Sequence, residues 1–155
     1  MARIHFTVLR ALQLILSLTS LGLSSYVVHW YMMGSRISSP APFNFLLFTS
    51  IFSVLSVVYL EAVPRFAPRI SHPYATIAVE MANTAFYFGA FIALAIFIGG
   101  LVFCQGTVCS VSRADTVIAA GQFTAWIATT ALTAKEMFVR NGTPTKDINH
   151  EMQQA

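Results

Sequence analysis

The sequence predicts an all-α fold: an integral membrane protein built as an antiparallel four-helix bundle. Of its 155 residues, 56% are hydrophobic and only 10% are charged, whereas an ordinary soluble domain carries about 25% charged residues. The chain also contains four apolar segments, each near the roughly 20 residues that a helix needs to cross a bilayer. Strands of a membrane barrel would be about half as long and would alternate in polarity, so helices are the expected elements.

Proline and charged residues mark the ends of these segments. The expected membrane spans are residues 8–33, 43–63, 74–103 and 114–139. Residues 1–139 then form one four-span domain, and residues 140–155 form a polar tail. The second span follows Pro40 and Pro42 and ends before Pro64, since proline breaks a helix where it stands. A cleaved secretory signal is the alternative for the first segment, but its apolar run is longer than the ~7–15 residues of a signal core.

Basic residues predict how the chain is oriented in the membrane. Four spans place the N-terminus, the second connection and the C-terminal tail on one side. The Lys and Arg residues on that side are Arg3, Arg10, Arg65, Arg69, Lys135, Arg140 and Lys146. The other side holds only Arg36 and Arg113. Because basic residues in short loops stay in the cytoplasm, we expect both termini to be cytoplasmic. Anionic lipid there attracts the net charge of +3, so no nucleic-acid partner is inferred.

Two cysteines, Cys104 and Cys109, fall in the connection between the third and fourth spans, on the expected outer or lumenal side. An oxidising compartment favours a disulfide, which would stabilise so small a ring by about 2 kcal/mol. Two unpaired thiols at a helix end are the alternative. Redox catalysis is disfavoured, because a membrane thiol oxidoreductase would need a Cys-x-x-Cys pair and a second pair to relay electrons.

Polar side chains repeat along one face of three spans. Spacings of three and four residues keep side chains on one face, because a helix has 3.6 residues per turn. The three seams are Arg10, Gln13, Ser17, Ser20 and Ser24; Thr76, Glu80, Asn83 and Tyr87; and Gln122, Trp126, Thr129, Thr133 and Glu136. We interpret them as faces turned toward protein rather than lipid. Chance alignment is the alternative, since serine and threonine are common in membrane helices.

Small residues form further rows on the last two spans. These rows are Ala78, Ala82, Ala85, Gly89 and Ala93 on the third span, and Gly121, Ala125, Thr129 and Thr133 on the fourth. Such rows let helix backbones approach closely in lipid. They predict a tightly packed bundle and leave open whether one row faces a second protomer.

Glu80 is the charged residue that most needs a partner. It lies six residues past Tyr74, which places it roughly 9 Å into the membrane from the cytoplasmic end. An isolated charge there costs at least ~2.5 kcal/mol on insertion scales. Arg10 enters from the same side and is the first candidate partner, with Lys135 second. Of the charges within the spans, Asp115 alone is expected near the outer rim.

Within the third span, the stretch E-M-A-N-T-A-F-Y-F-G-A-F from Glu80 to Phe91 resembles the third span of fungal MARVEL-domain proteins of the non-classical export and eisosome-associated type. An arginine ahead of a Leu- and Ser-rich first span, short loops, the cysteine pair and cytoplasmic termini also fit, so the likeness covers almost the whole chain. MARVEL relatives that build barrier scaffolds in plants similarly set a basic residue in the first span against an acidic one in the third. The resemblance implies that Arg10 and Glu80 match this pair.

The resemblance implies a non-enzymatic membrane organiser. Such a protein associates laterally, as a homo-oligomer or with other proteins, and prefers particular membrane lipids, with sterols and sphingolipids as candidates. It would organise membrane domains or traffic at the plasma membrane or on secretory-pathway vesicles.

A small proton-coupled transporter using Glu80 is the alternative, since membrane glutamates often carry protons. No Gly- or Pro-broken helix marks a midplane site, which argues against it. No catalytic residue, cofactor or metal site is expected, because the histidines are scattered and form no nucleophile–base or metal-binding pattern. These are His5, His29, His72 and His150.

Overall fold

A computed structural model of the chain describes residues 2–35, 38–67, 72–101 and 105–142. The described residues form four long helices and no strand: α1 (Ala2–His29), α2 (Ala41–Phe66), α3 (Pro73–Gly100) and α4 (Thr107–Gly142). A π-helical turn, η1 (Trp30–Gly34), continues α1. The all-α fold predicted from the sequence is confirmed.

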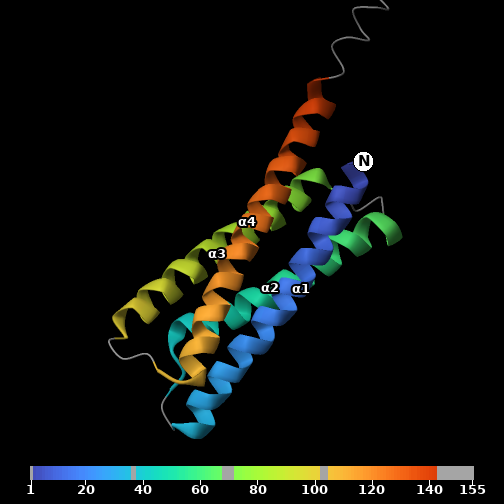
Figure 1. Ribbon diagram of the computed structural model, residues 1–155. Coiled ribbons are helices and arrows are strands. Elements are labelled where there is room, and N and C mark those ends of the chain that lie inside the picture. The colour runs from blue at the N-terminus through green and yellow to red at the C-terminus, as the bar shows by residue number, and fades with distance from the viewer. Residues whose placement is uncertain (1, 36–37, 68–71, 102–104, 143–155) are drawn as a thin grey trace, which may run out of the picture.

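The four helices run up and down in chain order and form a ring (Figure 1). α1 and α3 each pack against α2 and α4, whereas no described Cα atoms of α1 and α3 lie within 8 Å of each other. The start of α1 and the end of α4 lie at the same end of the bundle, which we call the termini end. All four helices are long and apolar enough to cross a membrane, so the chain is an integral multi-pass membrane protein.

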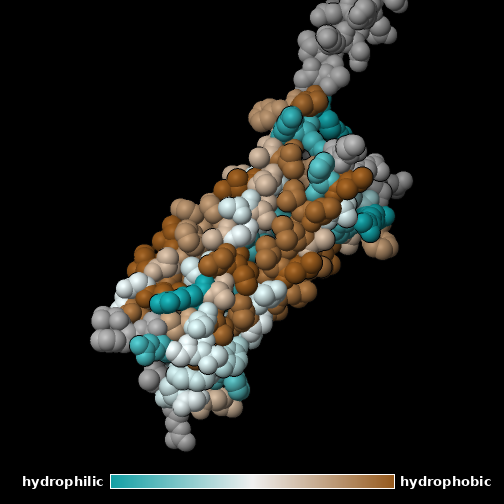
Figure 2. Space-filling model, viewed as in Figure 1, coloured by the Kyte–Doolittle hydropathy of each residue, from teal (hydrophilic) through white to brown (hydrophobic). Residues whose placement is uncertain are grey.

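The outer surface of the bundle is apolar along most of its length. Figure 2 shows hydrophobic residues over the middle of the visible face, with hydrophilic residues gathered toward the ends. Every helix points large hydrophobic side chains outward, each at least 60% exposed, including Val8, Ile15, Leu55, Ile96 and Val117. Lipid tails are as apolar as these side chains, so this exposure suits a surface that faces hydrocarbon.

Proline and glycine shape the starts of the later helices. Pro42 lies in the first turn of α2 and Pro73 is the first residue of α3. The N–H that proline lacks has no intrahelical acceptor at these positions. Gly106 precedes α4 with φ = 102°, a conformation that favours glycine. Its carbonyl accepts a hydrogen bond from the backbone N–H of Ser110 at 3.2 Å.

The second helix runs past the proline that the sequence predicts will end it. α2 continues to Phe66, with Pro64 in its last turn. A proline removes one intrahelical hydrogen bond, and only two residues follow it here. The helix therefore ends within the same turn, where the backbone N–H of Ala67 bonds the carbonyl of Val63 at 2.9 Å.

The fourth helix begins earlier than its expected membrane span. α4 starts at Thr107, so Cys109 and Arg113, expected in the connecting loop, lie in its first two turns. Cys109 and Ser112 are buried against the bundle, and this packing explains why the helix extends into a less apolar stretch. α4 also continues to Gly142 and takes in the first residues of the expected tail.

Several sequence predictions fall on residues that lie outside the described ones. Cys104 is one of them, so its disulfide with Cys109 stays a prediction. Arg36, Arg69 and Lys146 are others, and the side of the membrane on which the termini lie also stays a prediction. Residues 143–155 of the expected tail lie outside the described residues as well.

An apolar cluster fills the core toward the end opposite the termini. Phe43 of α2 is fully buried and meets Phe97 of α3 edge to face, with 5.9 Å between ring centroids. Val27, Leu46 and Leu94 belong to the same cluster. Because lipid is as apolar as these residues, close packing rather than escape from water holds them together.

Phe43→Ala should therefore destabilise the bundle, while Phe66→Ala on the same helix should not. In close-packed protein cores, Phe→Ala costs about 3–5 kcal/mol, part of it from the cavity left behind. Phe66 is 87% exposed and leaves no cavity. We expect Phe43→Ala to lower the thermal midpoint of the detergent-solubilised protein by several degrees, measured by circular dichroism. Equal shifts for the two variants would contradict this core.

Candidate functional site

Arg10 of α1 and Glu80 of α3 form a buried ion pair across the bundle. Nη2 of Arg10 donates to Oε1 of Glu80, and Nη1 donates to Oε1 of Gln13 at 3.2 Å. The guanidinium also lies over the ring of Trp126, 5.4 Å from its centroid. Lys135, the second candidate partner for Glu80, is exposed and makes no ion pair with any described residue. The pair thus joins two helices whose backbones stand apart.

Amide side chains connect α1 to α4 one to two turns deeper. Nε2 of Gln13 donates to the hydroxyl of Thr129 at 3.1 Å. Nε2 of Gln122 donates to the backbone carbonyl of Gln13 at 2.8 Å and to the hydroxyl of Ser17. All four side chains are fully buried. Each such bond contributes only about 0.6 kcal/mol in a membrane, so the connection depends on their number.

α2 contributes a fourth polar seam, which the three predicted seams do not include. The hydroxyl of Ser53 lies 2.8 Å from that of Ser17, and Nδ2 of Asn83 donates to the hydroxyl of Ser56 at 2.9 Å. Thr49, Ser53 and Ser56 are buried and follow one another at spacings of four and three residues. That spacing is the sequence signal that could have identified this seam.

Asp115 continues the polar core toward the opposite end of the bundle. Its two carboxyl oxygens accept hydrogen bonds from the hydroxyls of Ser20 and Ser24, both at 2.6 Å. The sequence places Asp115 at the outer rim, but it is fully buried and lies about 12 Å along α4 from its start. Asp115 precedes Gln122 by seven residues, which is two turns, so the same spacing rule places both on one face.

We call this set of buried side chains the polar network. Its members are Arg10, Gln13, Ser17, Ser20, Ser24, Ser53, Ser56, Glu80, Asn83, Asp115, Gln122, Trp126 and Thr129. Thr133 and Glu136, predicted in the α4 seam, are half-buried and exposed. α4 projects beyond the other helices at the termini end (Figure 1). The face of α4 that is buried at Thr129 is therefore less covered by neighbouring helices at Thr133 and Glu136. No group of three or more described His, Cys, Asp or Glu side chains could hold a metal ion.

Most of the chain matches a known membrane domain in sequence. The profile of the MARVEL family, a membrane-associating domain, matches residues 3–132. This chain belongs to the MARVEL family. The match spans the whole polar network, whereas the last turns of α4 lie beyond the MARVEL domain. No curated protein and no solved structure matches the chain with significance.

Breaking the Arg10–Glu80 pair should destabilise the MARVEL domain. Removing one partner of a buried pair leaves an uncompensated charge and typically costs about 3–5 kcal/mol. We expect Arg10→Ala and Glu80→Ala to lower the thermal midpoint strongly, and the exchanged variant Arg10→Glu/Glu80→Arg to recover part of the loss.

The matched control for this pair is Arg65→Ala. Arg65 pairs with Glu61 at 2.9 Å on the exposed end of α2, and exposed pairs contribute about 0–1 kcal/mol. A Glu80→Ala variant as stable as Arg65→Ala would show that the buried pair does not support the fold.

The double variant Ser20→Ala/Ser24→Ala should also unfold at a lower temperature, because Asp115 loses both hydrogen-bond donors. Each buried polar group left without a partner costs about 1–3 kcal/mol. Thr19→Ala is the control, since its exposed hydroxyl bonds the carbonyl of Ile15 in its own helix. Asp115→Ala should then lower the thermal midpoint less in the double variant than in the wild type, because its hydrogen-bond partners are already absent. An equal loss of stability in the two backgrounds would contradict this coupling.

Proposed function

We propose that this MARVEL protein is a non-enzymatic membrane organiser. It associates laterally with copies of itself or other proteins and gathers particular lipids, at the plasma membrane or on secretory-pathway vesicles. The polar network carries the proposal, because it occupies the interior and joins all four helices. The protein therefore contacts other molecules through its outer surface. Membership of a membrane-associating family supports the same class of function.

A groove between α3 and α4 supports lateral association. It has a volume of about 580 Å³, and its lining is mostly apolar and includes the small residues Ala85, Ala131 and Ala134. The rings of Phe88 and Phe123 border it, with 5.3 Å between their centroids. Small residues on an outer face let a helix of another protein approach closely. The groove therefore suits a second transmembrane helix.

The third-span motif supports the finer part of the proposal, a fungal-type MARVEL protein that prefers sterols or sphingolipids. The distribution of basic residues supports the proposal that both termini are cytoplasmic. Glu80, Asn83 and Tyr87 of this motif are fully buried, whereas Phe88 is about half exposed. The motif thus combines an internal seam with an aromatic outer face. Flat aromatic rings at that face are suited to packing against the ring system of a sterol.

One observation favours the alternative, a proton-coupled transporter. Oε2 of Glu80 is buried and has no hydrogen-bond partner among the described residues, and membrane carboxyl groups of this kind can carry protons. Against this alternative, Arg10 binds Oε1 of the same carboxyl group and neutralises it. We therefore keep the organiser as the proposed function.

The proposed function predicts slowly exchanging patches of the tagged protein in cell membranes, measured by fluorescence recovery after photobleaching. Ala131→Trp fills the α3–α4 groove and should disperse the patches. Val117→Trp is the control, because Val117 is 72% exposed on the same helix and does not line the groove. A wild-type protein that diffuses freely would contradict the organiser.

A flux measurement separates the organiser from the transporter. In proteoliposomes with an imposed pH gradient, we expect the wild type and Glu80→Gln to leak protons no faster than empty liposomes. A proton flux that Glu80→Gln abolishes, while fold and patches stay intact, would establish the transporter instead.

A further inference from the structure

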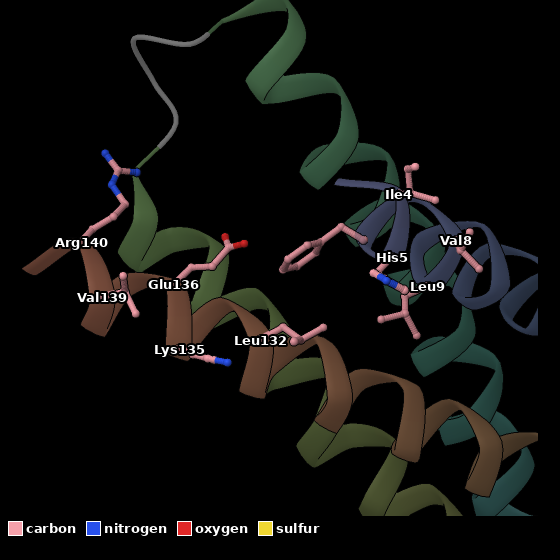
Figure 3. Close-up of a pocket in the computed structure, with 10 residues that line it drawn as sticks. Ile4, His5, Val8, Leu9, Leu132, Lys135, Glu136, Val139 and Arg140 are labelled. Atoms are coloured by element: carbon pink, nitrogen blue, oxygen red, sulfur yellow. The ribbon is translucent and has the colours of Figure 1, made fainter. Parts of the chain in front are cut away.

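An apolar cleft of about 1010 Å³ opens at the termini end, between the start of α1 and the end of α4 (Figure 3). Its lining residues are Ile4, His5, Phe6, Val8 and Leu9 from α1, and Leu132, Lys135, Glu136, Val139 and Arg140 from α4. Small-molecule sites commonly have volumes of ~300–1,000 Å³, so the cleft can hold a large ligand.

The polarity of this cleft changes along the helix axis. Leu9 and Leu132 are half-buried and lie deepest, within one turn of the Arg10 and Thr129 positions of the polar network. Lys135, Glu136 and Arg140 lie toward the end of α4, with Arg140 about 12 Å beyond Leu132 along the helix. The cleft is therefore apolar at depth and charged at its mouth, which is the polarity profile of a phospholipid.

The charged residues that line the cleft all belong to the last turns of α4, and in Figure 3 Glu136 and Arg140 point to one side of this helix while Lys135 points to another. Lys135 and Arg140 are positive and Glu136 is negative, and none of them forms an ion pair with a described residue. A phosphoserine head group carries the opposite set, because its phosphate and carboxylate are negative and its ammonium is positive. The three charged side chains of α4 are thus opposite in sign to the charged groups of this head group, and His5 of α1 lines the same cleft.

We propose that the cleft binds one phosphatidylserine molecule. An acyl chain lies between Leu9 and Leu132, the phosphate and carboxylate meet Lys135 and Arg140, and the ammonium meets Glu136. Phosphatidylserine belongs to the anionic lipid of the cytoplasmic leaflet, the side on which the termini are expected. The inference rests on the proposed organiser and adds a defined lipid site to it. Most of the α4 wall lies beyond the residues that match the MARVEL family.

The head-group assignment is tested on the purified full chain in nanodiscs that contain equal amounts of phosphatidylserine, phosphatidylglycerol and phosphatidylcholine, with the retained lipid identified by native mass spectrometry. We expect the wild type to retain phosphatidylserine. Lys135→Gln and Arg140→Gln should each lower this retention about fivefold, the effect of one basic residue near an anionic surface. Glu136→Gln should narrow the preference for phosphatidylserine over phosphatidylglycerol without removing it, because the ammonium loses its partner while the carboxylate keeps a basic one. Arg113→Gln, an exposed position near the other end of α4, is the control that should change nothing.

The cleft itself is tested by Val8→Trp, which fills it from the α1 wall. Val8 is 60% exposed, so the larger side chain fits without disturbing the core. Leu12→Trp, one turn further on and 45% exposed, is the control outside the cleft. We expect only Val8→Trp to abolish lipid retention.

Equal retention of phosphatidylserine and phosphatidylglycerol by the wild type would overturn the proposal, as would retention that Val8→Trp leaves unchanged. The photobleaching experiment is independent of this result. If the wild type still forms patches, the lipid site alone has failed, whereas freely diffusing wild type would mean that the organiser has failed.

Discussion

The ion pair between Arg10 and Glu80 is the interaction on which the arrangement of the bundle depends. The two residues stand on α1 and α3, the helices at opposite corners of the ring. Either charge alone in hydrocarbon would cost at least ~2.5 kcal/mol, so both helices must turn these faces inward. Once α1 is rotated in this way, Gln13 and Ser17 also point into the core, where they meet side chains of α4 and α2.

Polar contacts specify this bundle, whereas apolar contacts fill it. The hydrophobic effect cannot select the inward face of a helix in lipid, because the lipid is as apolar as the side chains. Hydroxyl and amide groups can, since each would otherwise lack a partner in hydrocarbon. α1 supplies most of these contacts: Arg10 reaches α3, Gln13 and Ser20 reach α4, and Ser17 reaches α2 and α4.

Because side chains of the four helices fill the interior, the molecule contacts other molecules through its outer surface. α4 takes part in both hollows that we consider functional. One of its faces borders the groove shared with α3, and its last turns form a wall of the cleft opposite α1. Because α4 projects beyond its neighbours at the termini end, one helix can contact another protein within the membrane and a lipid head group at its surface.

The sequence by itself determined the four helices, their order, and the inward faces of α1 and α3, because the spacing of polar residues in an apolar run is a local property. It also identified Glu80 as a charge that requires a partner. Only the tertiary structure decided which polar residues meet. Serine in an apolar helix can equally bond its own backbone, so nothing local pairs Ser53 with Ser17, or Asp115 with Ser20 and Ser24. The cleft likewise exists only where the start of α1 and the end of α4 face each other, a relation between helices that no single segment encodes.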